Sequence, residues 1–445
     1  MKPGPALAAA ALVWFFLGAA GFFSDNVSLI WLFVGLVLLP FIVLDGLVLF
    51  FFTGRFKVKR DIPVSLAQGE STVVRLEISR QGRGFIPFGI RLWDLHPKSM
   101  KCDSFPAVLD RKFLADSKEG ESLTFEYTLL PQERGQWVFH GMEFLLSSFC
   151  GFWRLKVFCP CGSSGRTYPD FRKIKAAAGT DLRGLLERTG VKNIRMRGQG
   201  LEFRGLRDYQ EGDSIRAVDW RATSRRRKVI IREYQEEQDQ QVLFLLDTGY
   251  RLNRLEDDSG RMQFDSALEA VLLLSWVGLK HGDSVGVSTF GSSTRWLGPR
   301  KGISSFPVLM NGLYDLSSTP SPSSPFSALE DALTRLKRRT FIVLISNFRE
   351  EDGESLSWIL RRIEQRHLLL LVSLREKESE FLASRRPEGT GEALETAAAF
   401  LYLGCRNDLY AAWEHSGILT MECGAGELAP ALINRYLQVK RSGRL

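Results

Sequence analysis

Two short segments place acidic, hydroxyl and amide side chains directly after apolar runs. Asp247-Thr-Gly-Tyr-Arg251 follows the run Val242–Leu246, and Ser346-Asn-Phe-Arg349 follows the run Phe341–Ile345. If both runs are strands of an open α/β sheet, the two segments lie at the carboxyl ends of the strands, where such sheets bind their ligands. Carboxylate, hydroxyl and amide oxygens can hold a cation or the polar groups of another protein. The chemistry to look for here is therefore binding.

Motifs of catalysis are scarce in the sequence. It has no G-x-x-x-x-G-K phosphate loop and no H-E-x-x-H zinc motif. Gly198-Gln-Gly200 does not follow a predicted strand, which favours a flexible turn over a dinucleotide site. The six cysteines are too few and too scattered for a disulfide scaffold, and they show no paired zinc spacing. We expect a protein that is not an enzyme, with no catalytic residue, metal or cofactor.

A segment between about Glu202 and Glu236 is dense in charges of both signs. One interpretation is a preorganised surface for another protein; the other is a connector held by ion pairs and by packing of Trp220, because arginine binds carboxylates equally well within a chain and across an interface. Both interpretations stay open. The candidate partner-binding residues are Arg207, Asp208, Tyr209, Asp213, Arg216, Asp219, Trp220, Arg232 and Glu233.

The chain is basic, with a formal net charge of +8 over 445 residues. This surplus is small for the length and names no partner by itself. The run Arg225-Arg-Arg-Lys228 makes binding of a polyanion a low-ranking alternative. Because no aromatic residues are interleaved with that run, specific binding of single-stranded nucleic acid is not expected.

Apolar runs and amphipathic stretches alternate over residues 239–445, which predicts a mainly parallel sheet with helices on both faces. Ser317–Pro325, rich in serine and proline, is predicted as a loop within this domain. Strands are predicted at about 242–246, 284–289, 341–345, 368–372 and 418–421, and helices at about 262–280, 326–337, 393–415 and 428–439.

Residues 55–172 alternate apolar and polar side chains in short runs, as in Thr72–Ile78, Leu123–Leu129 and Gln136–His140. This pattern predicts an antiparallel β domain that resembles a small sandwich and serves as a spacer. Cys159 and Cys161 are predicted as thiols at a strand end. Residues 173–238 are assigned to a connector that carries the charged segment.

Two apolar stretches, Ala6–Phe23 and Leu29–Phe52, make residues 1–54 a predicted transmembrane hairpin. The first stretch could instead be a signal peptide, because Lys2 precedes it and small residues end it. Basic residues follow the second stretch and none lies between the two, so the positive-inside rule predicts a multi-pass protein of the cell inner membrane with its bulk in the cytoplasm.

Asp45 is the one carboxylate well inside the second stretch, about 15 Å before the basic flank if the stretch is helical. A charged group at that depth would be costly. We expect either a polar contact within the membrane, across the hairpin or to a partner helix, or an aspartate tolerated beside the irregularity at Pro40.

The most specific pattern runs from Gly200-Leu-Glu-Phe-Arg-Gly-Leu-Arg-Asp-Tyr through Ala217-Val-Asp-Trp220 to Val229-Ile-Ile-Arg-Glu-Tyr-Gln-Glu236. It resembles the signature of the family called "domain of unknown function 58", with supporting pieces at Arg134-Gly135 and Tyr168-Pro169. The resemblance implies a multidomain bacterial membrane protein with a von Willebrand factor A-like α/β domain. It also implies an adaptor or scaffold that works with an AAA+ ATPase of the MoxR type.

Domains that resemble von Willebrand factor A bind Mg²⁺ through Asp-x-Ser-x-Ser, a threonine and a later aspartate. Here Asp247 matches the first ligand and is followed by Thr248, but Gly249 and Arg251 stand in place of the two serines, and Asn347 in place of the second carboxylate. Because Mg²⁺ needs near-octahedral oxygen ligands, we expect this adhesion site to be degenerate and metal-free. Arg251 is predicted to pair with Asp247 as a surrogate cation. A metal-dependent protein-binding module is the alternative.

Overall fold

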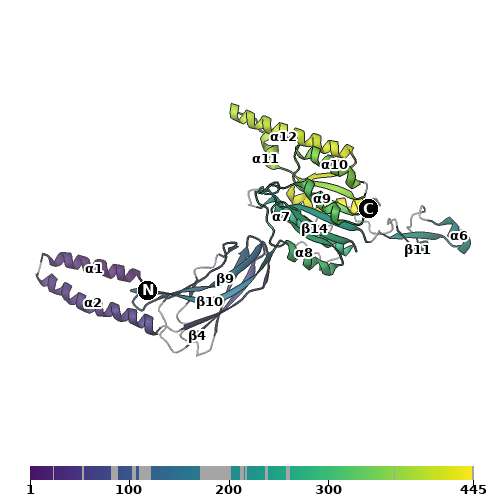
Figure 1. Cartoon of the computed structure of the whole chain (residues 1–445). Coiled ribbons are helices and arrows are strands. Elements are labelled where there is room, and N and C mark those ends of the chain that lie inside the picture. Colours follow the sequence, from purple (N-terminus) through teal and green to yellow (C-terminus); the bar gives the residue numbers. More distant parts are fainter. Residues whose placement is uncertain are drawn as a thin grey trace. The chain divides into compact units, whose positions relative to one another are not determined.

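The computed structural model describes residues 1–23, 25–52, 55–81, 89–102, 107–109, 122–170, 202–210, 215, 218–235, 239–256, 261–364 and 366–442. It divides into two compact units, Met1–Tyr168 and Pro169–Leu445 (Figure 1). Within the expected connector, residues 173–201 lie outside the described residues, as do Asp213 and Arg216.

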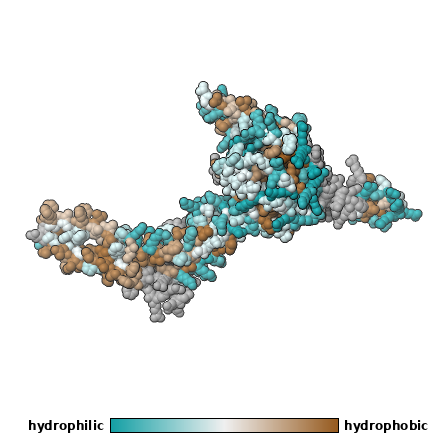
Figure 2. Space-filling view, in the orientation of Figure 1, coloured by the Kyte–Doolittle hydropathy of each residue, from teal (hydrophilic) through white to brown (hydrophobic). Residues whose placement is uncertain are grey.

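The first unit begins with a short strand and two apolar helices: β1 (Lys2–Pro3), α1 (Pro5–Gly21) and α2 (Asp25–Phe52). The helices pack side by side, with the rings of Trp14 and Trp31 stacked at 4.9 Å between centroids. Figure 2 shows the apolar surface of this pair. By length and composition, one described helix can cross a membrane: its stretch Asn26–Phe51 has a mean hydropathy of 2.8. The helix α1 is apolar but shorter than the usual span.

The rest of the first unit is a two-sheet sandwich. One sheet has the order β1-β10-β9-β5-β7, with β3 paired to β10, and the other has the order β2-β4-β8-β6. The expected β domain is therefore present. Its strands are β2 (Arg55–Asp61), β3 (Ser65–Ala67), β4 (Thr72–Gln81), β5 (Gly89–Asp94), β6 (Met100–Lys101), β7 (Ala107–Leu109), β8 (Ser122–Pro131), β9 (Gly135–Ser147) and β10 (Trp153–Tyr168).

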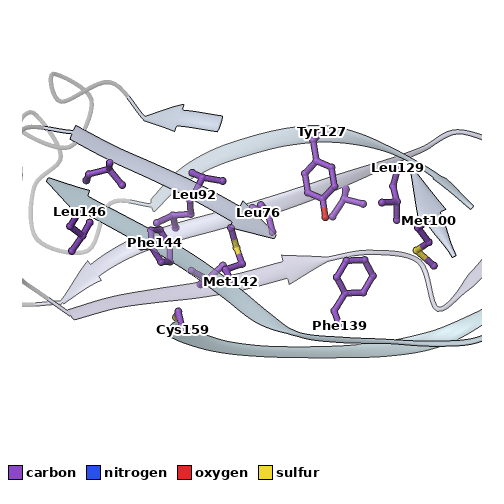
Figure 3. Close-up of a cluster of buried hydrophobic side chains, with 14 of the residues drawn as sticks. Leu76, Leu92, Met100, Tyr127, Leu129, Phe139, Met142, Phe144, Leu146 and Cys159 are labelled. Carbon is purple, nitrogen blue, oxygen red and sulfur yellow. The ribbon is translucent and has the colours of Figure 1, made fainter. Parts of the chain in front are cut away.

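Every second side chain along a strand points into the space between the two sheets, because successive side chains of a strand point to opposite faces. Leu76 and Leu129 come from one sheet and meet Leu92, Phe139 and Phe144 of the other, all at 0% exposure (Figure 3).

Cys159 and Cys161 lie within β10 and not at its end, so the prediction of strand-end thiols was wrong. The Cys-Pro-Cys sequence lies where the β9–β10 register shifts, between Pro160 and Ser163. This irregularity interrupts the alternation of apolar and polar side chains, so the strand seemed to end there.

The second unit contains a six-stranded sheet of order β15-β14-β13-β16-β17-β18. All neighbouring pairs are parallel except β14 with the edge strand β15, so the prediction of a mainly parallel sheet is confirmed. The strands are β13 (Gln241–Asp247), β14 (Ser284–Phe290), β15 (Arg295–Lys301), β16 (Phe341–Ile345), β17 (Leu368–Leu374) and β18 (Leu419–Cys423).

Helices cover both faces of this sheet. The helix α7 (Gln263–Lys280) packs with α8 (Phe306–Leu313) and α13 (Leu428–Arg441), while α9 (Pro325–Arg335), α10 (Asp352–Glu364) and α12 (Thr390–His415) contribute side chains to a core with Leu243, Leu245 and Leu344. The sequence prediction missed α8, α10, the strand β15 and the helix α11 (Lys377–Ser384). Short 3-10 helices occupy Ile303–Ser305 and Ala425–Glu427.

Candidate functional site

Asp247 is the last residue of β13, and its carboxylate is fully buried and accepts hydrogen bonds from neutral donors among the described residues. Its Oδ1 accepts from the Gly249 amide at 2.7 Å, and its Oδ2 accepts from the hydroxyls of Ser323 at 2.9 Å and Ser346 at 2.6 Å. Burial raises the pKa of this carboxyl, and the three hydrogen bonds act in the opposite direction. The carboxylate therefore ties together the ends of β13 and β16 and the loop before α9.

Gly249 is held by the close approach of that same loop. A Cβ at position 249 would lie 2.7 Å from the Ser321 carbonyl oxygen and 2.7 Å from the Ser323 Cβ. The Tyr250 amide donates to that Ser321 carbonyl at 2.9 Å, so the loop is bonded in place. A serine side chain, which an adhesion site would need here, cannot be accommodated without moving the loop.

Thr248 connects the carboxyl end of β13 to the carboxyl end of β14. Its hydroxyl donates to the Phe290 carbonyl at 2.7 Å and accepts from the Ser293 amide at 3.1 Å. The Ser292 hydroxyl donates to the Thr248 carbonyl at 2.8 Å. The hydroxyl of Thr248 therefore serves the packing of loops.

Arg251 pairs with Asp352, and not with Asp247 as the sequence suggested. Its guanidinium donates to both carboxylate oxygens of Asp352, with 3.0 Å between Nη2 and Oδ1, and to the Asn347 carbonyl at 3.0 Å. The two side chains are 5% and 8% exposed. Asp352 begins α10, three residues beyond the segment that the pattern had marked, and no periodic signal points to it. The surrogate-cation prediction was therefore wrong.

Asn347 is committed to the interior. Its amide nitrogen donates to the Arg251 carbonyl at 3.1 Å and to the Gln263 side chain at 3.0 Å, and its side-chain oxygen accepts from the Leu374 amide at 3.0 Å. These bonds join β13, α7, β16 and β17. The asparagine stands where a second metal-binding carboxylate was sought, and it acts as a cross-link between elements.

The charged segment forms a small unit of β11 (Glu202–Asp208), α6 (Trp220–Arg226) and β12 (Ile230–Gln235), with β11 and β12 antiparallel. Asp219 caps α6, because its Oδ1 accepts from the amides of Arg221 and Ala222, both at 3.0 Å. Its Oδ2 accepts from Arg232 Nε at 3.0 Å. The amide of Ala222 and the Arg232 guanidinium lower the pKa of Asp219. The Asp219–Arg232 pair is thus structural.

Trp220 does not pack against the rest of the chain, as the connector interpretation required, since it is 67% exposed. Tyr209 is 41% exposed, and Asp208 and Arg225–Lys228 are also exposed. The Arg207 guanidinium donates to the Asp208 carbonyl at 3.2 Å. Glu233 belongs to β12, but its side chain is outside the described set. Among the described candidates, the exposed aromatic and basic side chains are those available to a partner.

Residues 205–385 match the sequence model of the family described as "Protein of unknown function DUF58". Residues 205–385 are therefore a DUF58 region. The match runs from within β11 through β12 and the α/β domain as far as the residue after α11. No curated protein matches the sequence.

Solved structures align with parts of this chain at low identity. The crystal structure of the SpRpn10 VWA domain shares 12% identity over 44% of this chain and 94% of its own, with a TM-score of 0.28. Proximal thread matrix protein 1 from the mussel byssus shares 10% over 45% of this chain and 47% of its own, with a TM-score of 0.26. An uncharacterized membrane spanning protein from Vibrio fischeri shares 13% over 31% and 71%, with a TM-score of 0.17. Values this low say nothing about function.

The DUF58 region contains one serine pattern of hydrolase type, Gly282-Asp283-Ser284-Val285-Gly286. In a nucleophile elbow the serine follows a strand and precedes a helix, whereas Ser284 here begins β14. Asp283 is engaged by Lys440 Nζ, which lies 2.9 Å from each carboxylate oxygen. The pattern therefore lacks the geometry of a nucleophile.

The residues at the sheet edge of this DUF58 region do not fit Mg²⁺. Both oxygens of Asp247 are used by internal donors, Asp352 is used by Arg251, and the Asn347 side-chain oxygen is used by a backbone amide. Among the described residues, no group of three histidine, cysteine, aspartate or glutamate side chains is arranged to hold a metal.

We therefore expect calorimetry on the full-length protein to show no Mg²⁺ or Mn²⁺ binding at this edge. Gly249→Ser, which restores one hydroxyl of the adhesion pattern, is expected to leave the titration flat, because position 249 has no room for the side chain. Heat of binding that disappears in Asp247→Ala would contradict the prediction. The matched control is Asp265→Ala, which removes an acid from the first turn of α7.

Proposed function

We propose that this chain is a membrane-anchored, non-enzymatic adaptor whose DUF58 region binds a protein partner. By the resemblance to its family, that partner is an AAA+ ATPase of the MoxR type. The anchor is the helix pair α1 and α2, crossing a cell inner membrane twice, with the β domain and the DUF58 region in the cytoplasm. Basic residues after α2, and their absence from the turn between the helices, support that orientation.

The observation that carries the adaptor function is the surface of the β11–β12 unit. Trp220, at 67% exposure, begins α6, the exposed basic run Arg225–Lys228 begins in the last turn of that helix, and Ile215, which precedes the helix in sequence, is 71% exposed. Large apolar side chains at such exposure are costly to leave in water, and tryptophan and arginine are the residue types that most often dominate binding energies at protein interfaces. Asp219 and Arg232 hold the unit in shape beneath them.

The test is mild crosslinking of the full-length protein in its native membrane, followed by purification and mass spectrometry. We expect an AAA+ ATPase with the unaltered protein and about thirtyfold less with Trp220→Ala, because removing a central aromatic anchor commonly costs about 2 kcal/mol of binding. Trp220 is exposed, so the substitution leaves the fold intact. Substitution of Arg232 is less suitable, because it breaks the internal pair with Asp219.

Trp358→Ala is the matched control, because Trp358 is 63% exposed on α10, outside the β11–β12 unit. Equal recovery of the ATPase with both variants and the unaltered protein would place the contact elsewhere. Its absence from all samples would refute the adaptor proposal. Recovery of nucleic acid that is released by salt, and that depends on Arg225–Lys228, would favour the polyanion alternative.

A further inference from the structure

The helix α2 is longer than a bilayer requires. It has 28 residues and is therefore about 42 Å long, whereas the hydrocarbon layer is about 30 Å thick. The part from Asp25 to Leu44 already measures about 30 Å. The last two turns of α2, from Asp45 to Phe52, are therefore not needed to cross the hydrocarbon layer.

These last turns are built into the β domain. Leu49 is 1% exposed and belongs to the core between the two sheets. One turn earlier, a Cβ at Gly46 would lie 3.0 Å from the indole nitrogen of Trp153, so the helix backbone and β10 are in close contact. That indole nitrogen donates to the Ile42 carbonyl at 2.9 Å. The end of α2 is a helix of the folded domain as well as the end of a span.

Asp45 marks the point where α2 meets the turn between β9 and β10. Its side chain accepts a hydrogen bond from the Cys150 amide at 3.3 Å, and it is 8% exposed. The described contact is therefore to the β9–β10 turn, and not across the helix pair. A carboxylate bonded to a protein turn is better placed at the edge of the bilayer than within it.

The first helix starts at the same turn. The Gly4 amide donates to the Phe152 carbonyl at 2.7 Å, and Lys2 and Pro3 pair with Arg154 and Trp153 as a short antiparallel ladder. The helix α1 has 17 residues, or about 25 Å, and runs from this turn alongside the part of α2 that precedes Asp45. Both helices therefore contact the β domain at the same place, the turn between β9 and β10.

Exposed aromatic side chains lie at the end of α2 and in the turn that meets this helix. Phe50 and Phe51 are 60% and 69% exposed at the end of α2, and Phe149 in the β9–β10 turn is 56% exposed. The exposed residue Lys57 follows α2 in sequence, and the exposed residue Lys2 pairs with Arg154 next to the turn. Aromatic side chains and basic residues at the end of a span favour the headgroup layer.

We propose that the hydrocarbon boundary of the bilayer lies at Asp45, and that Phe50, Phe51 and Phe149 seat the β domain in the headgroup layer of an anionic membrane. This inference rests on the membrane anchor of the proposed function and not on the adaptor activity. It moves the boundary inward from the end of α2 at Phe52 by about 10 Å along the helix.

Spin labels on exposed positions of α2 measure this boundary in the full-length protein. The vesicles contain phosphatidylcholine and phosphatidylglycerol, and the native cysteines are replaced. We expect the deepest label at L36C, near the middle of Asp25–Leu44, and headgroup depth at F51C. A deepest label at L39C, with F51C still in the hydrocarbon, would place all of Asn26–Phe51 in the bilayer and overturn the proposal. An immobilised F51C label shielded from both lipid and water would indicate a protein partner there instead, and would also overturn it.

A second measurement keeps the native cysteines. Asp45→Cys is expected to form an intramolecular disulfide with Cys150 under mild oxidation, whereas Leu44→Cys, which is 57% exposed, is not. If D45C does not crosslink to Cys150, the contact between the β9–β10 turn and α2 is contradicted. Because neither measurement involves an ATPase, failure of the adaptor proposal would leave both results unchanged.

Discussion

Replacing Asp352 with alanine is expected to destabilise the α/β domain by about 3–5 kcal/mol, because it leaves a buried guanidinium without its counter-charge. Arg251 is 5% exposed on its side chain and donates to both oxygens of Asp352. The Arg349 amide, which donates to Asp352 at 2.9 Å, also loses its acceptor. The charge at 251 has no second described carboxylate within hydrogen-bond distance to take over this role.

Amide hydrogen exchange of the full-length protein, read by mass spectrometry, can measure the loss within this domain. Peptides from β13 and β16 are expected to exchange about 100-fold faster or more, since each 1.4 kcal/mol is a factor of ten. Glu351→Ala, which removes the exposed acid next in sequence, is the matched control and should change exchange little.

The double substitution Arg251→Met with Asp352→Leu separates charge from packing. Replacing both partners of a buried pair by apolar side chains is often close to neutral, so much of the lost protection should return. If Asp352→Ala exchanges like the unaltered protein, the pair does not hold the loops after β13 and β16 together.

Replacing Asp94 with alanine is expected to cost the β domain about 3–5 kcal/mol for the same reason. Arg60 and Asp94 form an ion pair whose side chains are both 0% exposed, with Arg60 Nε at 3.0 Å from Asp94 Oδ2. The Tyr127 hydroxyl donates to the same oxygen, and burial with this carboxylate raises the pKa of Tyr127. Without Asp94, the Arg60 guanidinium would lose its counter-charge in the core and keep only neutral described acceptors such as the Cys161 carbonyl, and the Tyr127 hydroxyl would lose its hydrogen bond to this carboxylate.

Amide hydrogen exchange of peptides from β5 and β8 measures the effect of this substitution. Exchange in the DUF58 region of the same molecule serves as an internal reference. Glu77→Ala is the control, because Glu77 lies on β4 in a surface pair with Lys59, 48% and 78% exposed. A surface pair contributes about 1 kcal/mol at most. Equal effects of Asp94→Ala and Glu77→Ala would show that the buried pair adds nothing special to the sandwich.

The architecture could be predicted because its signals are local. The alternation over Thr72–Ile78 and Leu123–Leu129 identified β4 and β8, and the apolar runs at 242–246 and 341–345 identified two neighbouring parallel strands. The missed helix α10 carries Leu356, Ile359, Leu360 and Ile363 at the spacing of a buried helical face, so its signal was present in the sequence and the prediction overlooked it.

The candidate site was found only in part. The pattern placed Asp247 and Asn347 at one sheet edge, because parallel strands end together. It could not show that Asp247 is bound by Ser323 and Ser346, since a run of serines and prolines carries no periodic signal. Hydrogen bonds between residues far apart in sequence depend on how loops pack, and no spacing rule describes that packing.

What the sequence by itself determined is the order of the parts: an apolar helix pair, an alternating β region, a charged segment with a family signature, and an α/β domain. Hydrophobic periodicity reports which side of each element is buried, and this is a local property. The tertiary structure alone decided the partner of each buried charge. Arg251 binds Asp352 and not Asp247, which is closer in sequence, because the hydroxyls of Ser323 and Ser346 already bind Asp247 and the start of α10 places a carboxylate within reach of the guanidinium.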